Sequence, residues 1–465
     1  MVFKIKRLEW VLVFLSVLVN LVYLSQELQC SAIQKRLHAT GEMWTGWAYS
    51  YYNHGISNKI ERLDPLKNGY ILYSGKEKKI IDFVNPPVGE TLGYPILAST
   101  VWRLTGVPSL LYMKIINIII FSLISILLFR INIFFVKEPW MAFICSLGVV
   151  AFPPLLYVNI IWFRDIFQYF GIIFFLYFFI YFVSSKKGNK FLYLGIFTCI
   201  LCQWIRASLF SSFFILSCLA FIFGLYRYFD NKKTLYFLKF FWISNILLFW
   251  VPFMTFNKVT YNTYFVAPTE EALFCSLCSP YPLPNGDMLK AEDYPDYTNE
   301  QVRIGKLDPK ISFYERYDIL YKDICKKYPY RKIECLIYRI KEIAFGNIQW
   351  RPLDLSTSFS LYRYIENFNF GRVSIKDLPE LFLHSYIPFM RLFGWIGIMI
   401  AIYRKKYFMV SMLLIGVVYS SGYMLLSHIE DRIIAVHAWP FGLFAFYSFG
   451  IIYKKIKLKI KNVVF

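Results

Sequence analysis

The sequence predicts an all-α polytopic membrane protein. Of its 465 residues, 57% are hydrophobic and only 17% are charged, and the apolar residues gather into long runs. Runs of about twenty apolar residues have the length of a helix that crosses the hydrocarbon core of a bilayer. The basic residues collect at the ends of these runs, where they meet headgroups and set the orientation of the chain. We therefore expect about ten transmembrane helices.

The expected spans follow from the positions of the apolar runs. They are 8–25, 112–135, 139–157, 161–183, 190–204, 207–226, 236–256, 384–403, 407–427 and 433–453. The first run follows Lys4, Lys6 and Arg7 and so resembles a signal peptide. No small-x-small cleavage site follows it, and we interpret it as an uncleaved first span.

The orientation follows from the charge of the connections between spans. If the N-terminus is cytoplasmic, every connection on that side is basic, as the positive-inside rule requires. These connections are 130–137, 184–190, 227–239, 404–406 and the tail after residue 453. We therefore expect a multi-pass protein of the plasma (inner) membrane with both termini in the cytoplasm. The basic residues that give the chain its net charge of +21 would contact anionic lipid headgroups, so nucleic acid is not an expected partner.

Three parts of the chain are expected. The first, 1–256, is a module of about seven spans that includes an external loop, 26–111. The second, 257–383, is an external soluble cap, and the third, 384–465, holds three spans and the basic cytoplasmic tail. In the cap we expect a helix from about 312 to 344. The cap also contains four cysteines: Cys275, Cys278, Cys325 and Cys335. Disulfide bonds between them are favoured over a zinc site.

The first external loop is expected to hold an amphipathic helix on the outer membrane surface. Apolar residues recur there at helical spacing. They are Ile96, Leu97, Val101, Trp102 and Leu104.

Ionisable residues in or beside the spans are candidates for function, because a charge near hydrocarbon is costly unless it is used. The two carboxylates of interest are Glu42 and Asp165, and both lie on the external side. The cationic candidates on that side are Lys114, Arg164, Arg206, His428 and Arg432. Each has a simpler explanation, since an arginine can snorkel to headgroups and Asp165 can pair with Arg164. Together, however, a base and several cations on one membrane face are suited to activating a hydroxyl and holding a phosphate.

Other chemistries lack their motifs. The sequence contains no G-x-x-x-x-G-K-[ST] loop, no H-E-x-x-H and no G-x-S-x-G, so a cytosolic nucleotide is not the evident energy source. Paired halves with interrupted helices, which a transporter would be expected to show, are not evident either.

The order of the external motifs resembles that of the GT-C superfamily, whose members are integral-membrane glycosyltransferases that use polyprenyl-phosphate-linked sugars. The nearest branch is that of the protein O-mannosyltransferases and lipid A aminoarabinose transferases. The matching pieces are Gly41-Glu42, Pro86-Pro87-Val88-Gly89, Lys114 with Asn117, Arg164-Asp165, and His428-Ile429-Glu430-Asp431-Arg432 followed by Pro440. In place of the family's late Arg-Tyr, this chain has Arg432-Ile433.

The resemblance implies an inverting transfer of a sugar from a polyprenyl-phosphate donor to a lipid, glycan or protein acceptor on the external (periplasmic) face. Glu42 would be the base, with Asp165 as a second catalytic residue, and the cations would stabilise the departing lipid phosphate. No cofactor is certain, and a divalent cation is left open because oligosaccharyltransferase relatives use one. Two alternatives stand beside this reading: an O-antigen-type polymerase or ligase, and a polysaccharide or lipid transporter.

Overall fold

The computed structural model describes residues 2–29, 42–56, 60–61, 83–84, 92–136, 138–151, 155–156, 159, 164–184, 190–206, 217, 231–261, 326, 329–330, 333, 337, 378–406, 410 and 439–464. Within these residues the chain is helical, apart from a short antiparallel pair of strands in which Ile60 of β1 (Ile60–Glu61) lies opposite Val84 of β2 (Phe83–Val84). The predicted all-α fold class is confirmed.

The helices run as follows. They are α1 (Val2–Gln29), α3 (Glu42–His54), α6 (Gly93–Thr105), α7 (Leu110–Val136), α8 (Pro139–Val150), α10 (Asp165–Ser184), α11 (Lys190–Ile205), α13 (Asn231–Asn245), the π-helical turn η1 (Ile246–Trp250), α14 (Val251–Tyr261), α20 (Leu378–Tyr403) and α23 (Trp439–Val464).

Several helices have the length and composition of membrane spans. Among the described residues, three are long and apolar enough to cross a bilayer: Leu110–Val136, Asp165–Phe182 and Asn231–Thr260. Four shorter apolar helices accompany them: Pro139–Val150, Phe191–Ile205, Leu392–Tyr403 and Gly442–Tyr453. A polytopic membrane protein is therefore confirmed, whereas the count of ten stays a prediction. The expected spans 207–226 and 407–427 lie almost wholly outside the described residues.

One predicted span is shorter as a helix than expected. The span expected at 139–157 ends as a helix at Val150, ahead of Pro153 and Pro154. Proline lacks the backbone donor that a helix needs and disfavours helical backbone in the residue before it. On either side of the expected cap, whose bounds stay a prediction, α14 continues to Tyr261 and α20 begins at Leu378. The rest of the cap, with its expected helix and cysteines, lies outside the described residues except for a few isolated positions.

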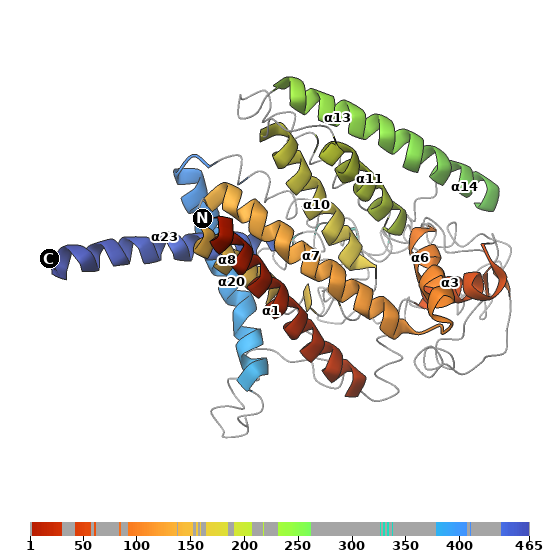
Figure 1. Cartoon of the computed structure of the whole chain (residues 1–465), viewed down its shortest axis with the longest axis horizontal. Helices are drawn as coiled ribbons and strands as arrows, with labels where there is room; N and C mark the ends of the chain where they lie inside the picture. Colours follow the sequence, from red (N-terminus) through yellow and green to blue (C-terminus); the bar gives the residue numbers. More distant parts are fainter. Residues whose placement is uncertain are drawn as a thin grey trace.

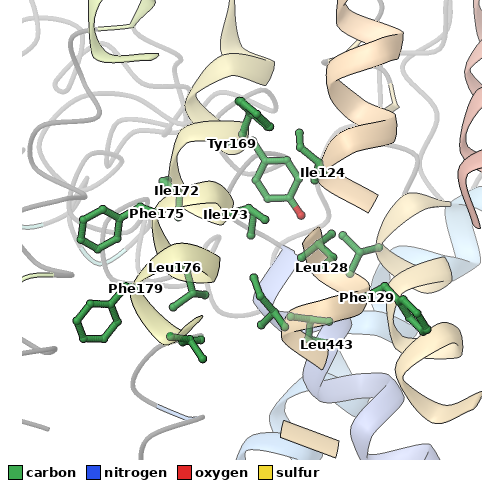
Figure 2. Close-up of a cluster of buried hydrophobic side chains, with 14 of the residues drawn as sticks. Ile124, Leu128, Phe129, Tyr169, Ile172, Ile173, Phe175, Leu176, Phe179 and Leu443 are labelled. Atoms are coloured by element: carbon green, nitrogen blue, oxygen red, sulfur yellow. The ribbon is translucent and has the colours of Figure 1, made fainter. Parts of the chain in front are cut away.

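The core of the helix bundle is rich in aromatic and branched side chains. Figure 2 shows buried side chains of α7, α10 and α23 drawn together, among them Ile124, Ile173 and Leu443. On another side of α10, the ring of Phe175 lies 5.0 Å from that of Phe241 in α13. Helices in lipid associate through such close packing, because there is little hydrophobic driving force between them.

Small residues and polar contacts bring the helices together. A side chain at Gly397 of α20 would collide with the backbone of Phe444 in α23, so these two helices approach closely. At the end of the bundle where the chain begins, Arg130 of α7 contacts Glu9 of α1, with Nε to Oε1 at 2.8 Å. Cys145, Cys199 and Cys202 are buried and free. A free thiol in such surroundings behaves as a small hydrophobic group.

Two short helices, α3 and α6, pack against each other at one end of the bundle. Figure 1 shows them beside the start of α7 and away from the chain's N-terminus, which lies at the opposite end of the helices. The expected amphipathic helix is present as α6, and it ends at Gly106 in the left-handed conformation, with φ of 73°. The residues of α6 that are buried are Tyr94, Pro95, Ala98, Ser99 and Trp102, whereas Leu104 is 83% exposed. Contact of its exposed apolar residues with the membrane surface stays a prediction.

The buried face of α6 has a physical reason. Apolar periodicity alone predicts contact with the bilayer, but α6 also packs on α3, and this contact selects small residues and aromatic rings. Ala48 of α3 lies in one buried cluster with Tyr94, Ala98 and Trp102 of α6.

Candidate functional site

The candidate site lies where the start of α6, the start of α10 and the end of α11 meet. The close approach of α6 and α11 requires Gly93, since a Cβ there would lie 2.8 Å from the amide nitrogen of Ile205 and would also collide with the carbonyl of Trp204. Arg206 follows directly, and its amide donates to the carbonyl of Cys202 at 2.9 Å. The last turn of α11 therefore delivers Arg206 to the beginning of α6.

Asp165 and Arg206 form a buried ion pair at this junction. Nε of Arg206 lies 3.3 Å from Oδ1 of Asp165, and the two side chains are 13% and 5% exposed. Asp165 is the first residue of α10, where the helix dipole favours a negative charge. A buried carboxylate beside a guanidinium is stable only when each compensates the other. The cation that contacts Asp165 here is thus Arg206, which the sequence did not single out as its partner.

Arg164 and Tyr94 complete the group. Arg164 is 5% exposed and lies just before α10, where its carbonyl accepts from the amide of Phe167 at 3.1 Å. The pKa of Tyr94 is raised well above its ordinary value, mainly by burial; the charge of Arg164 lowers it and that of Asp165 raises it. The phenol is therefore neutral and lies within the field of both charged neighbours. A neutral buried hydroxyl can donate a hydrogen bond.

Glu42 is the first residue of α3, and its side chain lies outside the described part of the molecule. The helix that carries it is firmly held. Trp47 stacks on Phe256 of α14 with ring centres 6.4 Å apart, and the guanidinium of Arg103 in α6 donates to the carbonyl of Tyr51 at 2.5 Å. Tyr52 donates to the carbonyl of Gly106 at 3.1 Å. The backbone of Glu42 therefore belongs to the same α3–α6 unit that presents Tyr94.

Lys114 lies in α7 and is fully buried, so it does not snorkel to the headgroups. One turn further along, Asn117 donates to the carbonyl of Asn159 at 3.1 Å, and the amide of Asn159 donates to Oδ1 of Asn20 at 2.5 Å. Asn20 in turn donates to the carbonyl of Ser16 at 2.8 Å. A buried chain of hydrogen bonds thus joins α1, Asn159 and α7, one helical turn from Lys114. Polar groups inside a membrane protein are costly unless they are paired or used.

The other predicted residues divide into two groups. Arg164, Asp165 and Arg206 are brought together, whereas His428 and Arg432 lie outside the described residues. Sequence reasoning missed Tyr94, which follows Gly93 in an unremarkable Gly-Tyr-Pro, and it also missed Asn159. The one available signal for Asn159 was a polar amide in a short connection between two apolar runs.

A divalent cation does not fit the described part of this site. Among the described residues, no group of three or more His, Cys, Asp or Glu could hold a metal ion. Asp165 contacts a guanidinium, and hard cations need several oxygen ligands without a competing positive charge.

Comparisons with known proteins give one structural likeness. Neither the protein-family models nor the curated proteins contain a match. The fold is similar to that of the archaeal oligosaccharyltransferase AglB from Archaeoglobus fulgidus, solved in complex with an inhibitory peptide and a dolichol-phosphate, with a TM-score of 0.51. This likeness concerns the fold. At 12% identity the match covers 98% of this chain and 51% of AglB, so this chain spans about half of that protein.

Proposed function

We propose that this GT-C-like chain is a membrane glycosyltransferase that moves a sugar from a polyprenyl-phosphate-linked donor to an acceptor on the external face of the membrane. The observation that carries the proposal is the buried group of Arg206, Asp165, Arg164 and Tyr94 at one end of the helix bundle. Two arginines and a neutral hydroxyl suit an anionic leaving group. The dolichol-phosphate bound to AglB supports a lipid-phosphate donor.

The arginines would act on the leaving group. When the bond between the anomeric carbon and the phosphate oxygen breaks, negative charge develops on the phosphate. Guanidinium groups bind phosphate with strong, charge-assisted hydrogen bonds. A preorganised cation in a water-poor site stabilises such charge without reorganisation during the reaction. Asp165 would keep Arg206 in place by its contact with Nε, and Tyr94 would add a neutral donor.

Glu42 would act on the acceptor. Its carboxylate would take the proton of the acceptor hydroxyl while that oxygen bonds the anomeric carbon from the face opposite the phosphate. The result is transfer with inversion, and the lipid phosphate leaves with the bonding electrons. The position of Glu42 at the head of α3, in the unit that also presents Tyr94, supports this assignment.

Three further cations belong to the proposal. Lys114, His428 and Arg432 would also contact the donor phosphate, with Lys114 approaching from within α7. A lysine binds phosphate as a point charge, so it does not require the planar geometry of an arginine. The burial of Lys114 is consistent with a role at the inner edge of the site.

The transferred sugar would be a hexose or a pentose, and the acceptor would be a lipid, a glycan or a protein. The inhibitory peptide held by AglB supports a protein acceptor. The plasma (inner) membrane, with both termini in the cytoplasm, is the proposed location. Figure 1 is consistent with this sidedness, since α3 and α6 lie at the end of the bundle opposite the N-terminus.

The proposal is tested by reconstituting the purified chain in nanodiscs and supplying a panel of polyprenyl-phosphate sugars. Surface glycolipids and glycoproteins from cells with and without the gene, compared by mass spectrometry, would identify the product to assay. We expect transfer by the wild type and loss of transfer by Arg206→Ala. The matched control is Thr100→Ala on the exposed face of α6, which should keep normal activity. Unchanged glycans in the deletion strain, together with no transfer from any donor, would contradict the proposal.

A further inference from the structure

The helix formed by α13 and α14 is interrupted by the π-helical turn η1, in which the amide of Val251 bonds to the carbonyl of Ile246. A π turn accommodates one extra residue and leaves helix carbonyls available to other donors; such turns are uncommon and concentrate at functional sites. Here the carbonyl of Leu248 accepts a hydrogen bond from Nε1 of Trp204 at 2.9 Å. The π turn is therefore connected to the last turn of α11.

A second hydrogen bond joins the same two segments. Nδ2 of Asn245, directly before η1, donates to Oε1 of Gln203 at 2.6 Å. Both side chains are completely buried. The ring of Trp204 also meets the ring of Phe249 edge to face, with centres 5.4 Å apart. Gln203 and Trp204, which are adjacent in α11, are thus hydrogen-bonded to Asn245, directly before η1, and to Leu248 within η1.

The same turn of α11 is closed in by α6, because Gly93 abuts the carbonyl of Trp204. Arg206 lies two residues beyond Trp204, and its amide is bonded back to Cys202. The backbone at Arg206 is therefore held between α6 and η1, and this fixes the point from which its side chain reaches Asp165. A fixed starting point reduces the range of positions that a long, flexible arginine can reach.

We propose that the π turn is a positioning device for Arg206 and that Trp204 and Gln203 are positioning residues for donor binding. The inference rests on the proposed function, in which Arg206 holds the donor phosphate. Simple core packing would need only the ring of Trp204 against Phe249. Positioning also needs the indole N–H on Leu248 and the amide pair of Gln203 and Asn245.

The test uses the full-length protein in nanodiscs and two variants. Trp204→Phe keeps an aromatic ring near Phe249 but removes the N–H donor, and Asn245→Leu removes the donor to Gln203. Each should raise the donor KM by about three- to tenfold, the effect of one hydrogen bond, and leave the acceptor KM unchanged. The matched control is Trp140→Phe in α8, an exposed tryptophan whose ring lies 5.9 Å from that of Phe143. That variant should match the wild type.

Two further measurements separate positioning from a general loss of structure. In an Arg206→Ala background, Trp204→Phe should add no further loss of donor binding, because residues that act through one another are not additive. Amide hydrogen exchange over residues 201–206 should be faster in Trp204→Phe, whether or not substrate is present. Additive losses, or faster exchange with an unchanged donor KM, would overturn the inference. If the wild type transfers no sugar but amide exchange over residues 201–206 is faster in Trp204→Phe, the hydrogen bonds from Trp204 do hold the end of α11, and it is the proposed function that fails.

Discussion

Gly93 at the start of α6 lies directly against the carbonyl of Trp204 at the end of α11, leaving no room for a side chain. This approach places Tyr94 beside the turn that presents Arg206. Gly93→Ala should therefore force the backbones apart and lower stability by about 1–3 kcal/mol, the usual cost of overpacking.

The loss is measured as the change in Tm of the detergent-solubilised protein. Thr100→Ala on the exposed side of the same helix is the control and should leave Tm within error. A Gly93→Ala variant as stable as the wild type would show that α6 and α11 can separate without cost.

Arg206 is expected to be the cation on which donor binding depends most. Arg206→Ala should weaken donor binding by roughly 2–5 kcal/mol, the range for removing one partner of a buried charge pair. Arg206→Lys should recover part of this, because lysine still binds phosphate as a point charge. Titration with a polyprenyl phosphate gives the affinity directly. Donor affinity that is unchanged in Arg206→Ala would limit the ion pair with Asp165 to a structural role.

Glu42 is expected to be the base. Glu42→Gln keeps the size of the side chain but cannot accept a proton, so turnover should fall by about 10²–10⁴ while the protein still inserts. Glu90→Gln and Asp82→Asn in the same loop are the controls and should cost much less. Turnover is measured at saturating donor. Near-normal transfer by Glu42→Gln, with loss of transfer in Asp165→Asn, would move the role of base to Asp165.

Tyr94 should make stability depend on alkaline pH. Its pKa is raised by burial, so in the unfolded chain it ionises near its ordinary value of about 10 while in the native state it stays protonated. The contribution of the buried Tyr94 phenol to the free energy of unfolding is therefore complete below about pH 10 and is lost as pH rises further. The decline in Tm between about pH 9 and about pH 11 should be shallower in Tyr94→Phe than in the wild type. Parallel curves would show that the phenol is not buried in the native protein.

Both long loops should be external and both termini cytoplasmic. Cysteines introduced at Ser74 and Asn285 should react with a membrane-impermeant reagent from outside intact cells. A cysteine at Lys457 should react only after permeabilisation, because the basic tail is retained in the cytoplasm. Labelling of Ser74 from the inside would invert the topology and place Glu42 and Asp165 on the wrong face for an external transferase.

The sequence by itself determined the class of the molecule. Long apolar runs with basic ends permit only helices in a bilayer, because every backbone group must be bonded within its own segment. It also identified Arg164, Asp165 and Arg206 as charges that lie next to hydrocarbon, and α6 as a helix. These features depend on composition and period, which are local properties of the chain.

Only the tertiary structure decided which of these charges meet. Asp165 contacts Arg206, 41 positions away, because the start of α10 and the end of α11 lie together at one end of the bundle. Tyr94 enters the group because Gly93 allows α6 to reach α11, and the face of α6 that packs was set by α3. The hydrogen bonds from Trp204 and Asn245 depend on a π turn that no propensity predicts. Contacts between residues far apart in the chain are determined by packing, and the spacing of residues along the sequence does not encode them.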